Sequence, residues 1–284
     1  MSTVTQTCYR HPDRETAVQC SNCGRPICPS CMTPTPVGMR CPECTKQKTQ
    51  VRTMRDISNP TITVTIALIA INVLLWIPSG NFGFGTSGIN AWSERLVLFG
   101  PYVADGEWWR LITGGFQHAS LFHIGFNMYL LYVLGQMLEP ALGRVRFGLV
   151  YFAALLAGSF GSLLLSPTAP TLGASGAVFG LMGFAVLEMR ARGMDPFAGG
   201  IFGSLGGLIV INLALSFLLP GISIGGHVGG LVGGGLCALA LAQIDRRRLP
   251  AWVGYAAIVV VGVVAFAGCL AVAGQPTGLF GGEV

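Results

Sequence analysis

Serine and histidine, which together carry out nucleophilic catalysis in many hydrolases, both occur beside glycines in the apolar part of this chain. Ser175 lies in a Gly-Ala-Ser-Gly sequence and His227 in a Gly-His-Val-Gly-Gly sequence, each at the start of a hydrophobic segment. A serine hydroxyl is a weak nucleophile and needs a base within hydrogen-bond reach. Polar groups in a bilayer are costly and mark candidate functional sites. The pair therefore predicts nucleophilic chemistry inside a membrane.

A second polar group begins another hydrophobic segment and contains His118, His123 and Asn127. His123 and Asn127 are four residues apart, so they share one face of a helix. Both side chains could donate hydrogen bonds to the oxyanion of an acyl-transfer intermediate. The backbone N–H of Ser175, at a helix start, could be a third donor.

Composition divides the chain into two parts. Of its 284 residues, 52% are hydrophobic and 10% are charged, whereas about 25% charged residues is usual for a soluble domain. The first 56 residues nevertheless hold eight of the 17 Lys and Arg and seven of the nine Cys. We therefore expect a small polar head and a large membrane body. The polar N-terminal stretch does not predict a cleavable signal peptide.

Seven segments are long or apolar enough to be membrane helices. The segment that begins near Ser175 is short, with about fifteen residues before Glu188. The seven segments are Thr61–Ile77, Ser120–Leu138, Val145–Leu165, Gly173–Leu187, Gly199–Leu219, Ile224–Ala242 and Trp252–Val272.

The positive-inside rule predicts the orientation of these segments. Basic residues occupy alternate connections, and fifteen of the 17 then lie on the same side as the head. The head is thus expected in the cytoplasm and the C-terminal tail outside. Segments two, four and six enter from the outer face, which brings His123, Ser175 and His227 to one depth below the outer leaflet. The assignment did not use these residues, so their shared depth supports a common site.

The predicted site has no carboxylate to orient the base, because the acids after Glu107 fall at inner ends of segments or in the tail. A Ser175–His227 dyad is therefore favoured over a triad. Glycines at four-residue spacing near both residues would let segments four and six pack closely. Phe179, one turn below Ser175, could support the imidazole.

These motifs resemble the rhomboid family of intramembrane serine proteases, across roughly Ile62 to Ala242. The matching features are Trp109-Arg110, His118-x4-His123-x3-Asn127, Gly-Ala-Ser175-Gly, and His227-x2-Gly230-x3-Gly234. The resemblance implies that Ser175 attacks a peptide bond of a substrate's transmembrane helix and that His227 acts as base and then acid. It also implies oxyanion roles for His123 and Asn127, a loop-supporting role for His118, and no metal for catalysis. Some members carry tyrosine where this chain has Phe179, so a hydroxyl role is absent at that position.

The head contains four Cys or His pairs, each with two intervening residues, which is metal-ligand spacing. Eight ligands suffice for two structural Zn²⁺ ions, and disulfides are disfavoured in a reducing cytoplasm. The arrangement resembles B-box-type cross-braced zinc fingers, which implies an alternating grouping of the ligands, although a sequential pairing stays open. In the alternating grouping, one site would be Cys8, His11, Cys28 and Cys31; the other would be Cys20, Cys23, Cys41 and Cys44.

The predicted protein is an all-α polytopic membrane protein with a zinc-stabilised N-terminal domain. Residues 1–45 form the double zinc-binding domain and 46–59 a polar linker. Residues 60–243 form a six-helix catalytic core, and 244–284 comprise a basic connection, a seventh helix and a short tail. The expected location is the cell membrane.

Three functions compete at this point. The leading prediction is a protease for transmembrane protein substrates. The others are an inactive rhomboid-like protein that binds membrane helices, and a transporter or channel. Both Ser175 and His227 are present, which argues against the inactive form, and the scarcity of mid-membrane acids argues against ion coupling. Membrane lipid surrounds the body, and the head is expected to contact a cytoplasmic protein, with nucleic acid the less favoured partner.

Overall fold

The computed structural model describes residues 6–35, 38–46, 62–84, 89–218 and 221–278, in two compact units. The units comprise Met1–Asn59 and Pro60–Val284. Most of the predicted linker and the C-terminal end of the predicted tail lie outside the described residues. The first unit contains the strands and short helices β1 Gln6–Thr7, β2 Glu15–Thr16, η1 Pro29–Cys31, β3 Thr33–Thr35, β4 Gly38–Arg40 and α1 Pro42–Lys46.

Two short antiparallel hairpins organise the first unit. β1 pairs with β2, and β3 pairs with β4, each through two or three residues. Its buried core consists of Ile27 and six cysteines. A core this small cannot stabilise a domain by itself, so a cross-link or a metal is needed.

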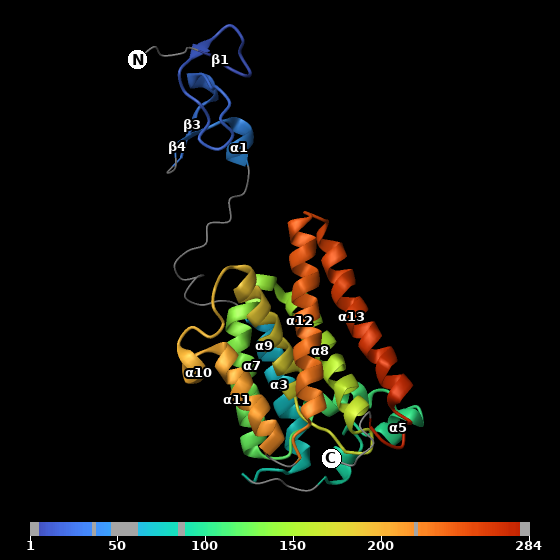
Figure 1. Cartoon of the computed structure of the whole chain (residues 1–284). Helices are drawn as coiled ribbons and strands as arrows, with labels where there is room; N and C mark the ends of the chain where they lie inside the picture. Colours follow the sequence, from blue (N-terminus) through green and yellow to red (C-terminus); the bar gives the residue numbers. More distant parts are fainter. Residues whose placement is uncertain (1–5, 36–37, 47–61, 85–88, 219–220, 279–284) are drawn as a thin grey trace. The chain divides into compact units, whose positions relative to one another are not determined.

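The second unit is a helical bundle (Figure 1). A part of the chain between its first and second long helices forms short helices instead of the plain connection that the sequence suggests. The helices are α3 Thr63–Trp76, η2 Ile77–Ser79, α4 Ala91–Glu94, α5 Gly100–Ala104, α6 Arg110–Thr113, η3 Gly114–Phe116, α7 Leu121–Leu142, α8 Arg144–Leu165, α9 Ser175–Ala191, α10 Gly200–Gly203, α11 Leu205–Leu218, α12 Ile224–Arg246 and α13 Ala251–Val272.

Among the described residues, four helices are long and apolar enough to cross a membrane: α7, α8, α12 and α13. The helices α3 and α11 are apolar but shorter, and α9 has 17 residues, as expected from the short segment that follows Ser175. The chain is therefore a polytopic helical membrane protein. α13 lies at the edge of the bundle, beside α12 and α8 (Figure 1), and has the smallest buried share of the four long helices.

The predicted segment Gly199–Leu219 is broken in the structure. Ser204 has an extended conformation (φ −130°, ψ 158°) and separates α10 from α11. Its hydroxyl accepts a hydrogen bond from the backbone N–H of Gly207 at 3.0 Å, as the N-cap of a new helix does. Glycine is a poor helix former, so a helix that continued through the glycines of this segment would be weak. The capping bond therefore favours a break, although the hydropathy of the segment predicts one continuous helix.

Glu139 is a buried acid with a structural role. Its side chain is 1% exposed and accepts hydrogen bonds from the N–H groups of Val64 and Thr65 at 2.9 and 2.8 Å. The first N–H groups of a helix lack partners within the helix, and a carboxylate favours their positive end. Glu139 on α7 therefore fixes the start of α3.

Glycines bring α12 into backbone contact with two helices at once. A methyl group on Gly230 would overlap the carbonyl oxygen of Gly176 on α9. On the other side, a methyl group on Gly229 would overlap the carbonyl oxygen of Ala157 on α8. The glycine spacing predicted the approach of α9 and α12, and the structure shows it. Together, α8, α9 and α12 form the tightly packed centre of the bundle.

Replacing Gly230 by alanine should destabilise the bundle by roughly 1–3 kcal/mol, because the added methyl group must push α9 and α12 apart. The measurement is the midpoint of thermal unfolding in detergent. The matched control is Gly148→Ala on α8, where the new methyl group would lie 3.7 Å from the nearest atom, Cγ1 of Val64. Equal midpoints for the two variants would contradict the packing described above.

Candidate active site

Ser175 is the first residue of α9, at the end of a loop segment that neighbouring loops hold in place. Thr171 exchanges two backbone hydrogen bonds with Leu98, at 3.0 and 2.8 Å. The N–H of Gly173 donates to the carbonyl of Gly114 at 3.0 Å. These bonds fix the approach to α9, so Ser175 has a defined position although its side chain is only half-buried.

His118 also holds this segment. Its Nε2 accepts a hydrogen bond from the backbone N–H of Ala174 at 3.4 Å, one residue before Ser175. The side-chain amide of Asn81 donates to the backbone carbonyl of His118 at 3.3 Å. His118 therefore contacts the loop, in the place where the sequence suggested a supporting residue.

His227 lies in the first turn of α12, which begins after the N-cap Ser223. The hydroxyl of Ser223 accepts a hydrogen bond from the N–H of Gly226 at 3.0 Å. Ser162 on α8 lies within hydrogen-bond distance of both Ser223 (2.9 Å) and Thr171 (2.8 Å). This hydroxyl cluster joins the start of α12 to the loop that leads into α9.

The structure brings Ser175 and His227 into direct contact. The Nε2 atom of His227 lies 2.8 Å from the Oγ atom of Ser175. The ring of Phe179 stacks on the imidazole, with centroids 4.2 Å apart and planes inclined by 17°. His227 is buried, with 8% of its surface exposed. A base within hydrogen-bond reach of a serine hydroxyl can activate that hydroxyl as a nucleophile.

The other nitrogen of His227 contacts a residue that sequence reasoning missed. Ser216 on α11 has its Oγ atom 2.7 Å from Nδ1 of the imidazole. The signal was present: Asn212 and Ser216, four residues apart, are the polar residues of an otherwise apolar helix. Carboxylates are the usual third members of such sites, so a hydroxyl did not stand out.

His123 lies close to the residues that precede Ser175. Its Nδ1 accepts a hydrogen bond from the N–H of Ala119 at 3.4 Å, which leaves the ring hydrogen on Nε2. A Cβ atom added to Gly173 would lie 2.8 Å from His123 Nε2 and 3.8 Å from Ser175 Oγ. The Nε2–H edge therefore reaches the neighbourhood of Ser175. Gly173 has φ +122°, so glycine is needed there for backbone reasons as well.

Asn127 shares the helix face of His123 but contacts it only along the helix. Its side-chain amide donates to the backbone carbonyl of His123 at 2.9 Å and is almost fully buried. Within the described residues, no hydrogen bond joins Asn127 to Ser175. To stabilise an oxyanion at Ser175, the amide of Asn127 would have to use its second N–H.

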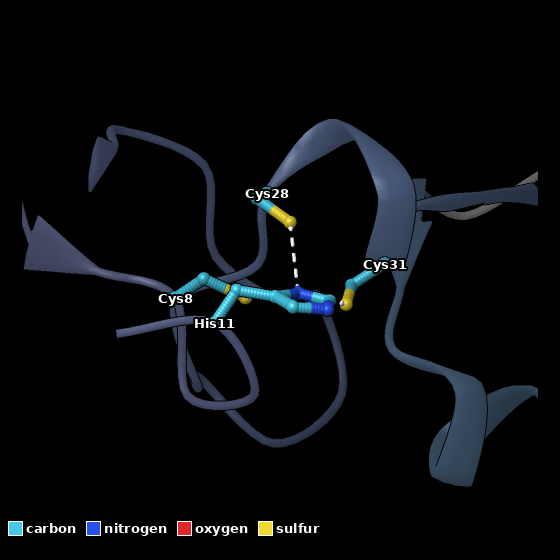
Figure 2. Close-up of side chains that lie close together, drawn as sticks. All are labelled: Cys8, His11, Cys28 and Cys31. Atoms are coloured by element: carbon cyan, nitrogen blue, oxygen red, sulfur yellow. Dashed lines mark hydrogen bonds between the residues drawn. The ribbon is translucent and has the colours of Figure 1, made fainter. Parts of the chain in front are cut away.

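The first unit gathers its predicted ligands into two clusters that could each hold a metal ion. The Nδ1 atom of His11 lies 3.4 Å from the sulfurs of both Cys28 and Cys31 and 3.9 Å from that of Cys8 (Figure 2). The second cluster consists of Cys20, Cys23, Cys41 and Cys44. The ligands are thus grouped alternately along the chain, as the likeness to cross-braced fingers implied.

The cysteine clusters have the dimensions that metal binding needs, and within each cluster the thiols differ in acidity: burial raises the pKa of Cys31 to about 11 and that of Cys41 to about 12. A tetrahedron built on zinc–sulfur bonds has edges of about 3.8 Å; the sulfurs of Cys23 and Cys41 are 3.9 Å apart. Burial raises the pKa of the Cys8 thiol, but hydrogen bonds from backbone N–H groups outweigh it and lower that pKa to about 6. The pKa of Cys20 is lowered to about 6 by the same balance, with the N–H of Cys41 as the largest favourable contribution. In each cluster, hydrogen bonds from the backbone therefore favour the thiolate form of one cysteine, the form that binds metal.

Arg25 connects the surroundings of the two clusters. Its guanidinium lies over the ring of Tyr9, 4.5 Å from the centroid, next to the first cluster. The same side chain donates to the sulfur of Cys23 in the second cluster at 3.3 Å. Such hydrogen bonds orient metal ligands from outside the coordination sphere.

Comparison with known proteins finds relatives of one family. The family model of the Rhomboid domain matches residues 105–244. The chain is 36% identical to the rhomboid protease GluP of Bacillus subtilis (strain 168) over 201 residues, which are 69% of this chain and 38% of that protein. It is 32% identical to the putative rhomboid protease YdcA of the same organism over 191 residues, 65% of this chain and 92% of that protein.

A eukaryotic relative shows the same likeness. Rhomboid-like protease 1 of Toxoplasma gondii is 32% identical over 188 residues, which are 60% of each chain. All the motifs that suggested the resemblance, from Trp109 to Gly234, lie inside the matched Rhomboid domain. The predicted family is therefore confirmed: this chain belongs to the rhomboid family.

Proposed function

We propose that this chain is an intramembrane serine endopeptidase that hydrolyses peptide bonds in or near the transmembrane helices of membrane proteins. The observation that carries the proposal is the 2.8 Å contact between Ser175 Oγ and His227 Nε2, at the starts of α9 and α12. The names of the relatives, which include rhomboid proteases and a rhomboid-type serine protease, support the same activity.

In the proposed reaction, the Oγ atom of Ser175 attacks the peptide carbonyl carbon while His227 Nε2 accepts the hydroxyl proton. The C–N bond then breaks, and the imidazolium of His227 gives its proton to the leaving amine. A water molecule hydrolyses the acyl-enzyme in the same way, with His227 again as base. His123 and the backbone N–H of Ser175 are proposed to stabilise the oxyanion, with Asn127 as a further donor.

The site is proposed to lie below the outer leaflet, with the N-terminus in the cytoplasm. Support comes from the distribution of Lys and Arg, which places fifteen of 17 on one side of seven spans. In this arrangement, residues 60–243 are the catalytic core and α13 is an accessory seventh span. The short helix α9 supports this arrangement. A helix of 17 residues is short for spanning the hydrocarbon core, so water can enter from one side and reach an acyl-enzyme at Ser175, its first residue.

The first unit is proposed to bind two structural Zn²⁺ ions through residues 1–45, with 46–59 as a linker. Its ligand chemistry, seven thiols and one imidazole in two clusters, suits zinc. The ions would replace the missing hydrophobic core and stabilise the fold. The exposed surface is then available for contact with a cytoplasmic protein.

The variants Ser175→Ala and His227→Ala should each lower cleavage of a transmembrane reporter at least about 10³-fold, because nucleophile and base act as a unit. The measurement is product formation in liposomes. Ser159→Ala is the matched control: this buried serine donates to the carbonyl of Leu111 at 2.8 Å and should remain active. Undiminished cleavage by Ser175→Ala would disprove the proposed site.

Removing zinc from the full chain with a chelator should unfold the first unit, because the ions stabilise its fold. Reporter cleavage should be unchanged, because neither cluster contributes a residue to the Ser175–His227 dyad. The measurements are zinc release, proteolytic sensitivity of residues 1–45, and cleavage in the same sample. Loss of cleavage in step with zinc release would contradict this prediction, because it would show that cleavage depends on the folded first unit.

A further inference from the structure

Ser216 is a buried serine that no sequence motif singled out. It lies near the end of α11, eleven positions before His227, and only 3% of its surface is exposed. Its neighbours Phe217 and Leu218 are exposed to the surroundings of the bundle, whereas Ser216 points inward. A buried hydroxyl in an apolar helix needs a partner. Ser216 has two.

The two partners of Ser216 differ in what they can do. The backbone carbonyl of Asn212, at 2.8 Å, can only accept a hydrogen bond. The Nδ1 atom of His227, at 2.7 Å, can either donate or accept, according to the tautomer. A serine hydroxyl has a single hydrogen. If that hydrogen is given to Asn212, the hydroxyl oxygen must accept from His227.

This assignment decides the state of the whole ring. A hydrogen on Nδ1 leaves Nε2 of the neutral imidazole as an acceptor. Nε2 is the atom that lies 2.8 Å from Ser175, so the serine hydroxyl must be the donor in that contact. In this assignment the four groups form one chain of hydrogen bonds in a single direction: Ser175 to His227 to Ser216 to the carbonyl of Asn212.

We infer that Ser216 is a positioning residue that keeps His227 in the tautomer able to take the proton of Ser175. The inference rests on the proposed function of the dyad and adds a third member to it. In soluble serine proteases a carboxylate does this work. A hydroxyl can do it in an apolar bundle without the cost of burying a charge.

Within the part of the chain that the structure describes, no hydrogen bond joins the side chain of Asn212 to the ring. Its amide donates to the carbonyl of Leu208 at 2.8 Å, on its own helix. The backbone carbonyl of Asn212 is therefore the group from that residue which enters the chain. The base is thus held by three different elements: its own helix α12, the ring of Phe179 on α9, and Ser216 on α11.

The test compares Ser216→Ala and Ser216→Thr with wild type and with Ser159→Ala, in the full chain. Ser216→Ala should lower kcat for a transmembrane reporter about 10- to 100-fold with KM unchanged, as expected for a lost buried hydrogen bond. Ser216→Thr keeps the hydroxyl and should recover most of that loss. Ser159→Ala removes a buried hydroxyl elsewhere and should match wild type.

A spectroscopic measurement tests the tautomer independently of turnover. The chain has four histidines, so ¹⁵N labelling of histidine gives few signals, and His227→Ala identifies those of His227. Wild type and Ser216→Thr should show a protonated Nδ1 and an unprotonated Nε2. In Ser216→Ala the other tautomer should become populated. Measured unfolding midpoints separate this effect from misfolding.

The outcomes distinguish a failure of this inference from a failure of the proposed protease function on which it rests. Wild-type kcat and an unchanged His227 tautomer in Ser216→Ala would overturn the role of Ser216 while Ser175→Ala is still inactive. An equal loss in the alanine and threonine variants, with the wild-type tautomer in both, would also overturn it. Cleavage that survives Ser175→Ala would instead overturn the proposed function.

Discussion

The close backbone approach of α9 and α12 is the constraint on which the rest of the structure depends. Ser175 is the first residue of α9, and His227 is the fourth residue of α12. Their 2.8 Å contact requires the two helix axes to lie closer than larger side chains would allow. Gly176 and Gly180 on α9 face Gly230 and Gly234 on α12, with backbone against backbone. The glycines are thus part of the chemistry, although none of them takes part in a reaction.

Hydrogen bonds of hydroxyl groups and a histidine then fix the positions of the two helix starts that the glycines bring together. Ser162 holds the loop before α9 and the cap of α12 at the same level, through Thr171 and Ser223. His118 holds the N–H of Ala174. These bonds are neutral, and Glu139, a buried acid of the helical unit, is committed to the start of α3. The bundle thereby orders a polar site with little buried charge, which suits an apolar surrounding.

The sequence predicted the parts of the site that depend on residue type and spacing. Ser175 and His227 stood out because each begins an apolar segment beside glycines, and Phe179 followed from helical periodicity. The family followed from four motifs in order, and the comparisons confirm it. Most of the seven apolar segments became single helices, with ends displaced by a few residues.

Other features depend on tertiary contacts and could not be predicted from spacing. The break at Ser204 comes from a capping bond that hydropathy does not report. Ser216 reaches His227 only because α11 packs beside α12, and a serine in an apolar helix has no spacing rule that names its partner. The grouping of the metal ligands came from a likeness to known fingers, since the spacing alone left two pairings open.

The most direct test of the account is to identify which residue of the unmodified chain reacts with a serine-directed fluorophosphonate. Mass spectrometry of the labelled protein should find the adduct on Ser175, because that hydroxyl alone is proposed to be activated by His227. His227→Ala should abolish the label without unfolding the protein. An adduct on a different serine, or none on the folded wild-type chain, would contradict the account.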